Sequence, residues 1–253
     1  ALTQAINEAK TVTLFVGAGV KDAREQVLKL AEKIKAPIGH ALGGKMYIQY
    51  ENPFDVGMNG LLGYGAAHEA THEADLLILL GTDFPYNDFL PDANVAQVDI
   101  NGSHIGRRTK ISYPVTGDVA ATIENILPHV DEKKDRSFLD KMLKKHYGKL
   151  EHVVEAYTSN VDKHTPIHPE YVADLIDRNA DEDAIFTVDT GMCNVWGARY
   201  ITANGKREQI GSFRHGTMAN ALPQALGAQA ANPGRQVITF SGDGGLSMLM
   251  GEL

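Results

Sequence analysis

The chain has 253 residues, a formal net charge of −8, a pI near 5.7 and a single cysteine, Cys193. The acidic balance argues against a nucleic-acid-binding protein, and no apolar run reaches the roughly 20 residues needed to span a bilayer. One cysteine excludes an intrachain disulfide and fits a reducing cytoplasm, where we expect the protein to reside.

The first half of the chain alternates apolar runs with helical patterns. Runs of β-branched and aliphatic residues predict strands at 11–17, 37–40, 75–81, 94–100 and 110–115. Helical patterns lie at 22–34, 66–74 and 119–127. Asp118 is a predicted N-cap, and Pro114 restricts its strand to a sheet edge. This alternation predicts a parallel doubly wound sheet, on which ligands bind at the carboxyl ends of the strands.

Two glycine-rich stretches follow predicted strands. Gly17 and Gly19 form a turn after the first strand and are candidate cofactor-binding residues. They are not part of a dinucleotide fingerprint, because Asp22 occupies the third glycine position. The tract 52–65 is polar and rich in glycine, which is costly in conformational entropy and indicates a loop ordered by a ligand.

His68-Glu69-Ala70-Thr71-His72 matches the HExxH pattern of zinc hydrolases. The predicted helix ends within a few residues of the motif, and Asp75 stands where one zinc-protease class carries glycine. The third histidine of that class is absent from the motif. We therefore interpret the motif as a polar helix face rather than as a zinc site.

Residues 131–165 carry many lysines with interleaved acidic residues, which indicates a solvated, mostly helical linker. A second α/β unit begins near Pro169. Its predicted strands are 184–188, which ends before Asp189, and 237–240. The expected parts are a domain at 1–130, a linker at 131–165 and a second, truncated domain at 166–253.

The turn 241–245, Ser-Gly-Asp-Gly-Gly, follows the last predicted strand and precedes a helix. Its three glycines permit close backbone approach to a ligand, and a helix N-terminus favours anions. The Asp243 carboxylate suits a divalent cation held between protein and phosphate. Taken alone, the motif is equally compatible with an ordinary turn that carries one exposed aspartate.

A second motif lies upstream of this turn, where Gly216-Thr217-Met218 opens an alanine- and leucine-rich run that predicts a helix from Ala219 to Ala230. The segment GSFRHGTMANALPQALGAQ, followed by GDGG, resembles the diphosphate-binding domain of thiamine-diphosphate enzymes of the pyruvate oxidase and pyruvate:quinone oxidoreductase family. The resemblance implies that Asp243 ligates the Mg²⁺ that holds the cofactor diphosphate. The implied cofactor-binding residues are Gly216, Thr217, Met218, Asp243, Gly244 and Gly245. The backbone at Gly216 would meet the aminopyrimidine, and Met218 would support the bent cofactor between its two rings.

The resemblance covers the whole chain, through segments such as IKAPIGHALGGK, NPFDVGMNGLLG and LGTDFPYNDF. It implies a FAD-binding middle domain followed by the first half of a thiamine-diphosphate-binding domain. By position, the FAD contacts would be Asn59, Gly60, Leu61, Leu62, Thr82, Asp83, Phe84, Pro85, Tyr86 and Asp99. The Asp99 carboxylate would lie near the adenosine part of FAD.

The activity implied by the resemblance is the oxidative decarboxylation of pyruvate with thiamine diphosphate, Mg²⁺ and FAD, giving acetate or acetyl phosphate and CO₂. Electrons would pass to oxygen or to a quinone, and quinone reduction would bring the protein to the membrane surface. A homo-oligomer, either a tetramer or a dimer of dimers, is expected. The alternatives are an acetohydroxyacid synthase-like carboligase and a non-catalytic flavin-binding module.

The two ends of the chain suggest an internal segment of a longer polypeptide. Ala1 is not an initiator methionine, and Leu253 interrupts a predicted helix. The family's catalytic glutamate would precede this segment, and the asparagine that completes its magnesium site would follow it. We therefore place no catalytic residue in this chain and expect the segment alone to be inactive.

Overall fold

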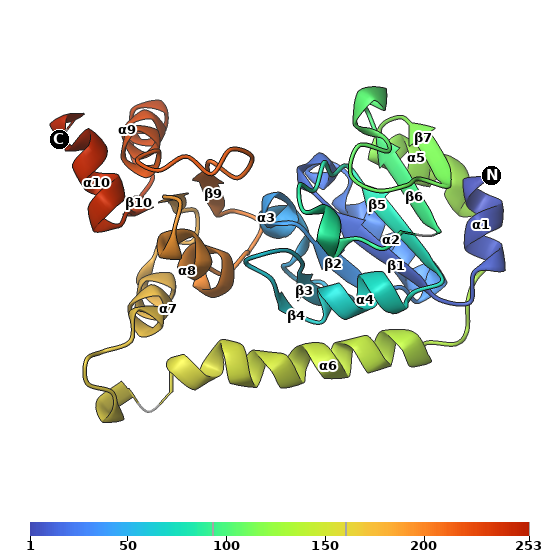
Figure 1. Ribbon diagram of the computed structural model, residues 1–253, viewed down its shortest axis with the longest axis horizontal. Coiled ribbons are helices and arrows are strands. Elements are labelled where there is room, and N and C mark those ends of the chain that lie inside the picture. Colours follow the sequence, from blue (N-terminus) through green and yellow to red (C-terminus); the bar gives the residue numbers. More distant parts are fainter. Residues whose placement is uncertain (93, 160, 253) are drawn as a thin grey trace. The chain divides into compact units, whose positions relative to one another are not determined.

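The computed structural model describes residues 1–92, 94–159 and 161–252. The chain divides into two compact units, Ala1–Leu150 and Glu151–Leu253. Each unit has its own sheet (Figure 1).

A seven-stranded sheet forms the centre of the first unit, in the order β4-β3-β2-β1-β5-β6-β7. Its strands are β1 (Val12–Val16), β2 (Ile38–His40), β3 (Asp55–Met58), β4 (Tyr64–Gly65), β5 (Leu76–Leu80), β6 (Val95–Asp99) and β7 (Tyr113–Thr116). All neighbouring pairs are parallel except β3 and β4. The strand order reverses between β1 and β5, so the crevice of a doubly wound sheet lies at their carboxyl ends.

Helices cover both faces of this sheet. They are α1 (Leu2–Glu8), α2 (Arg24–Ile34), α3 (Lys45–Ile48), α4 (Ala67–Glu73), α5 (Val119–Ile126) and α6 (Ser137–Val153). Short 3₁₀ helices lie at Ala18–Val20, Leu42–Gly44, Asn87–Phe89, Gly102–His104 and Leu127–His129. Because side chains alternate along a strand, Leu14 packs in one core with residues of α1, α2 and α5. Thr13 points to the other face, where its hydroxyl donates to the Ala70 carbonyl of α4 at 2.6 Å.

Local signals fix several boundaries in this unit as predicted. The Asp118 carboxylate accepts the Ala121 amide at 2.9 Å and caps α5. Pro114 lies in β7, which is an edge strand of the sheet. The doubly wound α/β fold expected from the sequence is therefore confirmed.

Three expectations about the elements were wrong in detail. The tract 52–65 is not a loop throughout, since it contains the antiparallel pair of β3 and β4. Strands do not alternate strictly with helices, because only a 3₁₀ turn separates β6 from β7. The helical run expected from Ala219 begins at Ala221, because Ala219 has a positive φ of 64°.

The second unit holds a three-stranded parallel sheet in the order β10-β8-β9. Its strands are β8 (Ile185–Val188), β9 (Glu208–Gly211) and β10 (Val237–Phe240). Its helices are α7 (Pro169–Asn179), α8 (Met192–Tyr200), α9 (Ala221–Ala231) and α10 (Asp243–Leu249), with 3₁₀ turns at Glu155–Tyr157, Val161–Lys163 and Met250–Glu252.

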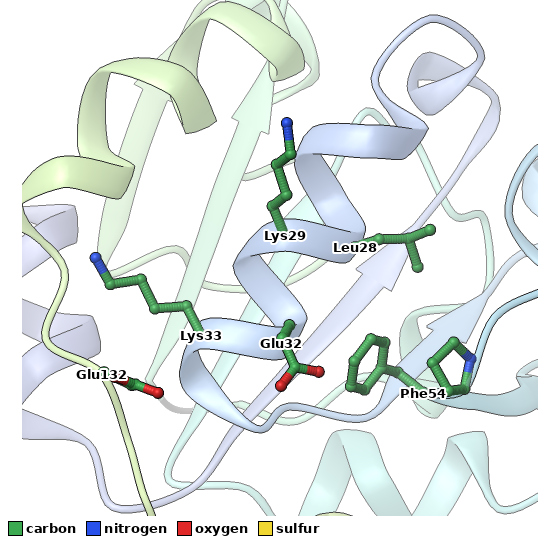
Figure 2. A pocket seen from close by; sticks show the side chains of 7 residues that line it. Leu28, Lys29, Glu32, Lys33, Phe54 and Glu132 are labelled. Carbon is green, nitrogen blue, oxygen red and sulfur yellow. The ribbon is translucent and has the colours of Figure 1, made fainter.

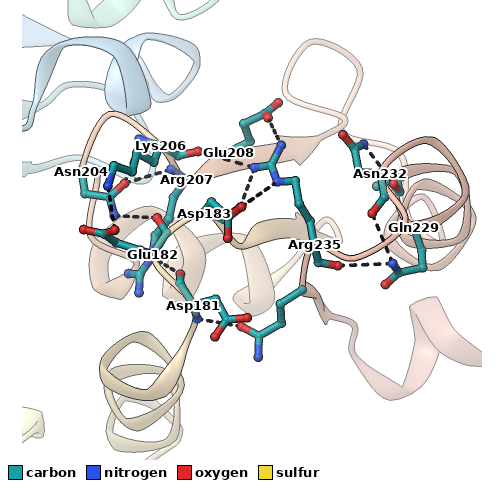
Figure 3. Close-up of polar contacts among 12 residues, drawn as sticks. Asp181, Glu182, Asp183, Asn204, Lys206, Arg207, Glu208, Gln229, Asn232 and Arg235 are labelled. Atoms are coloured by element: carbon teal, nitrogen blue, oxygen red, sulfur yellow. Dashed lines mark hydrogen bonds and ion pairs between the residues drawn. The ribbon is translucent and has the colours of Figure 1, made fainter.

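Polar contacts tie together the amino ends of these three strands (Figure 3). Arg235, just before β10, donates to the Asp183 carbonyl and pairs with Glu208 at 2.7 Å. Arg207, just before β9, pairs with Asp177 at 2.7 Å and donates to the Asp181 carbonyl. Because the strands are parallel, this polar edge leaves the opposite, carboxyl edge to carry a ligand.

A surface hollow of about 570 Å³ lies on the outer side of α2 (Figure 2). Its lining residues are Leu28, Lys29, Glu32, Lys33, Pro53, Phe54 and Glu132. None of them belongs to the predicted cofactor sites. In the described parts of the chain, none of the helices combines the length and the hydropathy of a membrane span.

Candidate cofactor site

Three turns meet at the carboxyl edge of the three-stranded sheet, one after each strand. Asp189 follows β8, the segment 212–220 follows β9, and the Ser241–Gly245 turn follows β10. The buried strand β8 lies between the other two and fixes the central turn. The predicted Gly216–Met218 and Asp243–Gly245 motifs, which are separated by an entire helix in the sequence, therefore lie at one edge.

Asp189 connects these turns through its carboxylate, which is 1% exposed. Its Oδ1 accepts the side-chain amide of Asn220 at 2.9 Å and the Asn220 backbone amide at 3.2 Å. Its Oδ2 accepts the hydroxyl of Ser241 at 3.1 Å. A buried carboxylate needs such donors, so the residues on the neighbouring turns are held in place by it.

The Gly216–Asn220 turn has an unusual backbone. Gly216 has a φ of 65°, a conformation that suits glycine, and its amide donates to the Ser212 carbonyl at 2.8 Å. The Thr217 carbonyl accepts the Thr190 hydroxyl at 2.8 Å and the Asn220 side-chain amide at 2.6 Å. The turn thus leaves Thr217 and Met218 at the surface, where Met218 is 42% exposed.

The glycines of the last turn are required by close contacts. A Cβ built on Gly245 would stand 1.8 Å from Asp189 Oδ2, and one on Gly244 would stand 3.2 Å from the Met218 Cε. Asp243 is exposed, and within the described part of the chain its carboxylate accepts only the adjacent Gly244 amide, at 2.8 Å. The site therefore presents one outward carboxylate beside a side-chain-free backbone.

Cys193 lies on α8 beside this edge, 3.7 Å from the position of a Cβ on Gly242. Burial raises the pKa of its thiol, and the nearby Asp189 charge raises it further. A thiol held protonated is a poor nucleophile, so Cys193 packs as a small apolar residue.

The residues present fit a magnesium-bound diphosphate cofactor. Asp243 supplies a hard, charged oxygen of the kind that Mg²⁺ prefers. Gly244 and Gly245 form a cradle without side chains, which a diphosphate could approach. The side-chain oxygen of Asn220 is buried and without a hydrogen-bond partner among the described residues, so the turn retains an acceptor.

In the first unit, the turns after β1 and β5 pack directly on each other at the strand-order reversal. The Gly19 amide donates to the Gly81 carbonyl at 2.9 Å. A Cβ on Gly17 would stand 2.6 Å from that carbonyl oxygen, and Gly81 itself has a φ of 57°. Gly17 and Gly19 are therefore required by loop packing, whether or not a ligand contacts them.

A second group of predicted residues gathers beside this crevice. Asn59 is buried, and its side-chain amide donates to the Phe89 carbonyl at 2.9 Å while its oxygen accepts the Gly60 amide. Gly60 has a φ of 105°, and a Cβ there would touch the rings of Tyr86 and Phe84 at 2.9 and 3.1 Å. Two segments far apart in sequence thus form one aromatic corner.

The remaining predicted residues are less uniform. Leu61 is 68% exposed, and Pro85 is also exposed. Thr82 is buried, and its carbonyl accepts the Gln97 side-chain amide. These residues and Leu62 belong to the stretches that the sequence resemblance assigns to FAD binding.

Two acidic residues of this set behave differently. Asp83 is bound by Arg108 and Arg107 at 3.0 and 3.1 Å, and these cations hold its pKa below the usual value although burial raises it. Asp99 ends β6, and its carboxylate accepts the Asn101 amide at 2.8 Å. Asp83 is therefore engaged by two arginines, whereas Asp99, buried at a strand end, accepts the Asn101 amide and lies 3.5 Å from the His104 Nδ1.

The HExxH residues serve the packing of helices. The Glu69 carboxylate pairs with Lys149 of α6, and the His72 Nδ1 contacts the Thr71 hydroxyl at 3.1 Å and the His68 carbonyl at 2.9 Å. In the described parts of the chain, no group of three or more His, Cys, Asp or Glu residues is arranged to hold a metal ion.

Asp189 and Asn220 were absent from the predicted site. The sequence did carry a signal for Asp189, which is an acidic residue directly after a buried apolar run, where ligand turns begin on parallel sheets. Asn220 gave no such signal, because it lies at the start of an alanine- and leucine-rich run that reads as helix.

The fold and this edge define a class of cofactor-binding enzyme, and comparison with known families identifies it. Residues 1–126 match the family described as thiamine pyrophosphate enzyme, central domain. Residues 189–253 match the thiamine pyrophosphate enzyme C-terminal domain, which binds that cofactor, the molecule named thiamine diphosphate above. The chain therefore belongs to the thiamine pyrophosphate enzyme family.

Individual relatives agree with this assignment. The chain is 35% identical, over 99% of its length, to a Bacillus subtilis protein provisionally named thiamine pyrophosphate-containing protein YdaP, covering 43% of it. It is 32% identical to a Mycobacterium bovis acetolactate synthase, over 98% of this chain and 41% of the relative. It is 47% identical over 59% of its length to a 42.6 kDa Pseudomonas amyloderamosa protein, covering 38% of it. The chain spans less than half the length of these relatives.

Proposed function

We propose that the second unit binds magnesium and thiamine pyrophosphate, and that the full-length protein decarboxylates a 2-oxo acid, pyruvate. The observation that supports this is the meeting of the Gly216–Met218 and Asp243–Gly245 turns around the Asp189 carboxylate in a chain of this family. When bound, thiamine pyrophosphate supplies a nucleophilic carbon and accepts the electron pair released with CO₂.

The residues of this chain would bind and orient the cofactor. Asp243 would hold Mg²⁺, and the backbone of Gly244 and Gly245 would meet the diphosphate. Thr217 and Met218 would contact the organic part of the cofactor. Asp189 would act on the cofactor only through the turns that it holds.

For the product, we propose carbon–carbon bond formation of the acetolactate synthase kind. This proposal is supported by two relatives, from Escherichia coli and Mycobacterium bovis, that are named acetolactate synthase. Each aligns with 98% of the length of this chain. This choice replaces the oxidative reaction expected from the sequence. Oxidation of pyruvate remains the second candidate, since the GTMANALPQALGAQ segment resembles pyruvate oxidases.

We further propose FAD at the carboxyl edge of the seven-stranded sheet and a homo-oligomeric enzyme, a tetramer or a dimer of dimers. FAD is supported by the Gly60, Phe84 and Tyr86 corner and by Asp99 at a strand end. If oxidation is the reaction, the electron acceptor would be oxygen or a quinone. Flavin absorbance of the purified protein tests the first point and light scattering the second.

One assay separates the two reactions. The purified full-length protein is given pyruvate, phosphate, FAD, Mg²⁺ and thiamine pyrophosphate, once with an added quinone and no oxygen and once with oxygen, and CO₂, acetolactate and reduction of the acceptor are measured. One acetolactate formed per CO₂ supports carboligation. One quinone or one oxygen molecule reduced per CO₂ supports oxidation, and the absence of CO₂ release with either acceptor would remove both.

A further inference from the structure

The first unit contains a buried group of titratable side chains outside both proposed cofactor sites. It consists of His40 on β2, Asp55 on β3 and His146 on α6. His40 is fully buried, His146 is 4% exposed, and the Asp55 side chain is 12% exposed. The Asp55 carboxylate oxygens lie 3.7 Å from His40 Nε2 and 4.0 Å from His146 Nε2.

The β3–β4 hairpin is shaped around the imidazole of His146. Gly57 and Gly65 have φ values of 91° and 76°, which L side chains rarely adopt. A Cβ on Gly65 would stand 2.2 Å from His146 Nδ1, and one on Gly57 would stand 3.2 Å from it. The ring therefore occupies the space that side chains on the hairpin would need, and it seats α6 on the sheet edge.

The remaining contacts of α6, with β3 and α4, are partly apolar and partly ionic. Met142 of α6 packs in a core with Val56, Ala66, Ala67 and Ala70. Besides Asp55 and His40, the charged and titratable groups on the elements around His146 are Lys45, Tyr47, Tyr64, His68, Glu69, His72, Glu73, Asp140, Lys141, Lys144, Lys145, Tyr147, Lys149, Glu151 and His152. Glu73 pairs with Lys141 and Lys145, and Glu69 pairs with Lys149, so these acids are already compensated at the surface.

Burial and the lack of a direct hydrogen bond favour a neutral pair of Asp55 and His146. Their separation of 4.0 Å exceeds a hydrogen-bond length, so an ion pair would lack the direct bond that offsets desolvation. Burial raises the pKa of Asp55 to about 7, although the Gly57 amide that donates to its Oδ1 at 3.2 Å, the Gln49 side chain and the Lys45 charge each lower it. Burial also lowers the pKa of His146 to about 4. While α6 is docked at pH 5 to 6, the proton of this pair is thus on the carboxyl group.

We propose that Asp55 and His146 form a proton-sharing latch for α6, in which one proton rests on the Asp55 carboxyl while the helix is docked and is held by the His146 imidazole when the helix lifts. In water the carboxyl loses its proton and the imidazole gains one, so the number of bound protons does not change. His40 is on an internal strand covered by α4, so lifting α6 alone should not expose it.

This balance makes helix docking insensitive to pH between about 4 and 6.5. Either group alone would make it sensitive, because a lone histidine favours opening in acid and a lone aspartate favours opening in base. α6 runs from Ser137 to Val153 and is the covalent connection toward the second unit. The latch would therefore keep this connection docked as the surrounding pH changes.

Hydrogen exchange of the α6 amides in the full-length protein tests the latch, with opening constants taken after correction for intrinsic exchange. In the wild type, the opening constant of α6 should vary by less than about threefold from pH 4.5 to 6.5. In Asp55→Asn this constant should rise about tenfold for each pH unit that the pH falls. In His146→Gln it should rise about tenfold for each pH unit that the pH rises. His152→Gln, an exposed histidine on the same helix, should keep the flat profile.

Two outcomes would overturn the proposal. One is a flat profile in both single variants, which would mean that the two residues only fill space. The other is a wild-type His146 ring that titrates near pH 6.5 by NMR, which would mean that the docked ring is not held neutral. The NMR measurement needs no variant and decides the matter even if a substitution prevents folding.

Discussion

Gly245 approaches Asp189 so closely that a Cβ on the glycine would stand 1.8 Å from the carboxylate Oδ2. The Asp189 carboxylate, at the end of β8, thus occupies the space that a side chain at position 245, near the start of α10, would need. Gly245→Ala should push the carboxylate away from Asn220 and Ser241. We expect a loss of about 2–3 kcal/mol in unfolding free energy and at least a tenfold weaker binding of thiamine pyrophosphate.

Gly227 provides the matched control for this substitution. It lies in α9, and a Cβ there would meet no atom within 4 Å. Gly227→Ala should therefore leave cofactor binding unchanged and stabilise the helix by up to about 1 kcal/mol. Urea unfolding and cofactor titration of both variants compare them. Equal stability of the two would show that the Asp189 contact is easily relieved.

Asp243→Asn separates a metal ligand from a turn residue. If Asp243 holds Mg²⁺, the neutral amide weakens that bond while keeping the shape of the side chain, so activation by thiamine pyrophosphate should require at least tenfold more cofactor. A turn residue would tolerate asparagine. The measurement is activity of the full-length enzyme against cofactor concentration, with flavin absorbance as the control, because the FAD candidates lie on a separate sheet. An unchanged activation curve would exclude Asp243 as a ligand.

The sequence predicted those features that depend on local patterns. Val237–Phe240 is a short apolar run before a glycine turn, and Asp118 precedes a helical pattern, so the strand, the turn and the cap could all be placed. The GDGG and GTM motifs predicted the cofactor-binding residues of the second unit, but only through a family resemblance and not through geometry. The product of the reaction was not fixed by any residue pattern.

The features that were missed depend on tertiary contacts. The β3–β4 hairpin lacks the alternation of a strand pair, because Gly57 and Gly65 make room for His146, which is 89 and 81 residues further along the chain. His146 itself lies in a lysine-rich segment that indicates a solvated helix. Asn220 precedes a helix that starts late because of the backbone at Ala219.

Gly65→Ala tests the packing of the hairpin against α6. The substitution places a Cβ 2.2 Å from His146 Nδ1 and 2.7 Å from the Val56 carbonyl, on a backbone with φ of 76°. We expect a loss of about 2–4 kcal/mol in the unfolding free energy of the first unit. In a His146→Ala background the same change should cost less, since one of the two clashes is gone. Gly148→Ala on α6, where a Cβ meets nothing within 4 Å, is the control.

Global stability should carry a pH dependence that differs from that of α6 opening, because unfolding also exposes His40. Burial lowers the pKa of His40 to about 3 and of His146 to about 4, so both stabilise the fold above their unfolded value near 6.5 and lose that contribution as pH falls. Burial raises the pKa of Asp55 to about 7, so its contribution is present below its unfolded value near 3.8 and is lost as pH rises to 7. Between about pH 4 and 6.5, these three residues together therefore take up two protons and release one on unfolding.

Asp55→Asn removes the released proton from this balance. The unfolding free energy of the variant minus that of the wild type should rise by on the order of 1 kcal/mol per pH unit up to about pH 7 and then stay constant. Urea unfolding at pH 5, 6, 7 and 8 measures this difference, and the other titrating groups cancel because both proteins share them. The control is Asp140→Asn, which removes an exposed carboxylate on α6 that pairs with Arg136. A difference that does not vary with pH would mean that Asp55 is ionised throughout, and the neutral pair with His146 would not exist.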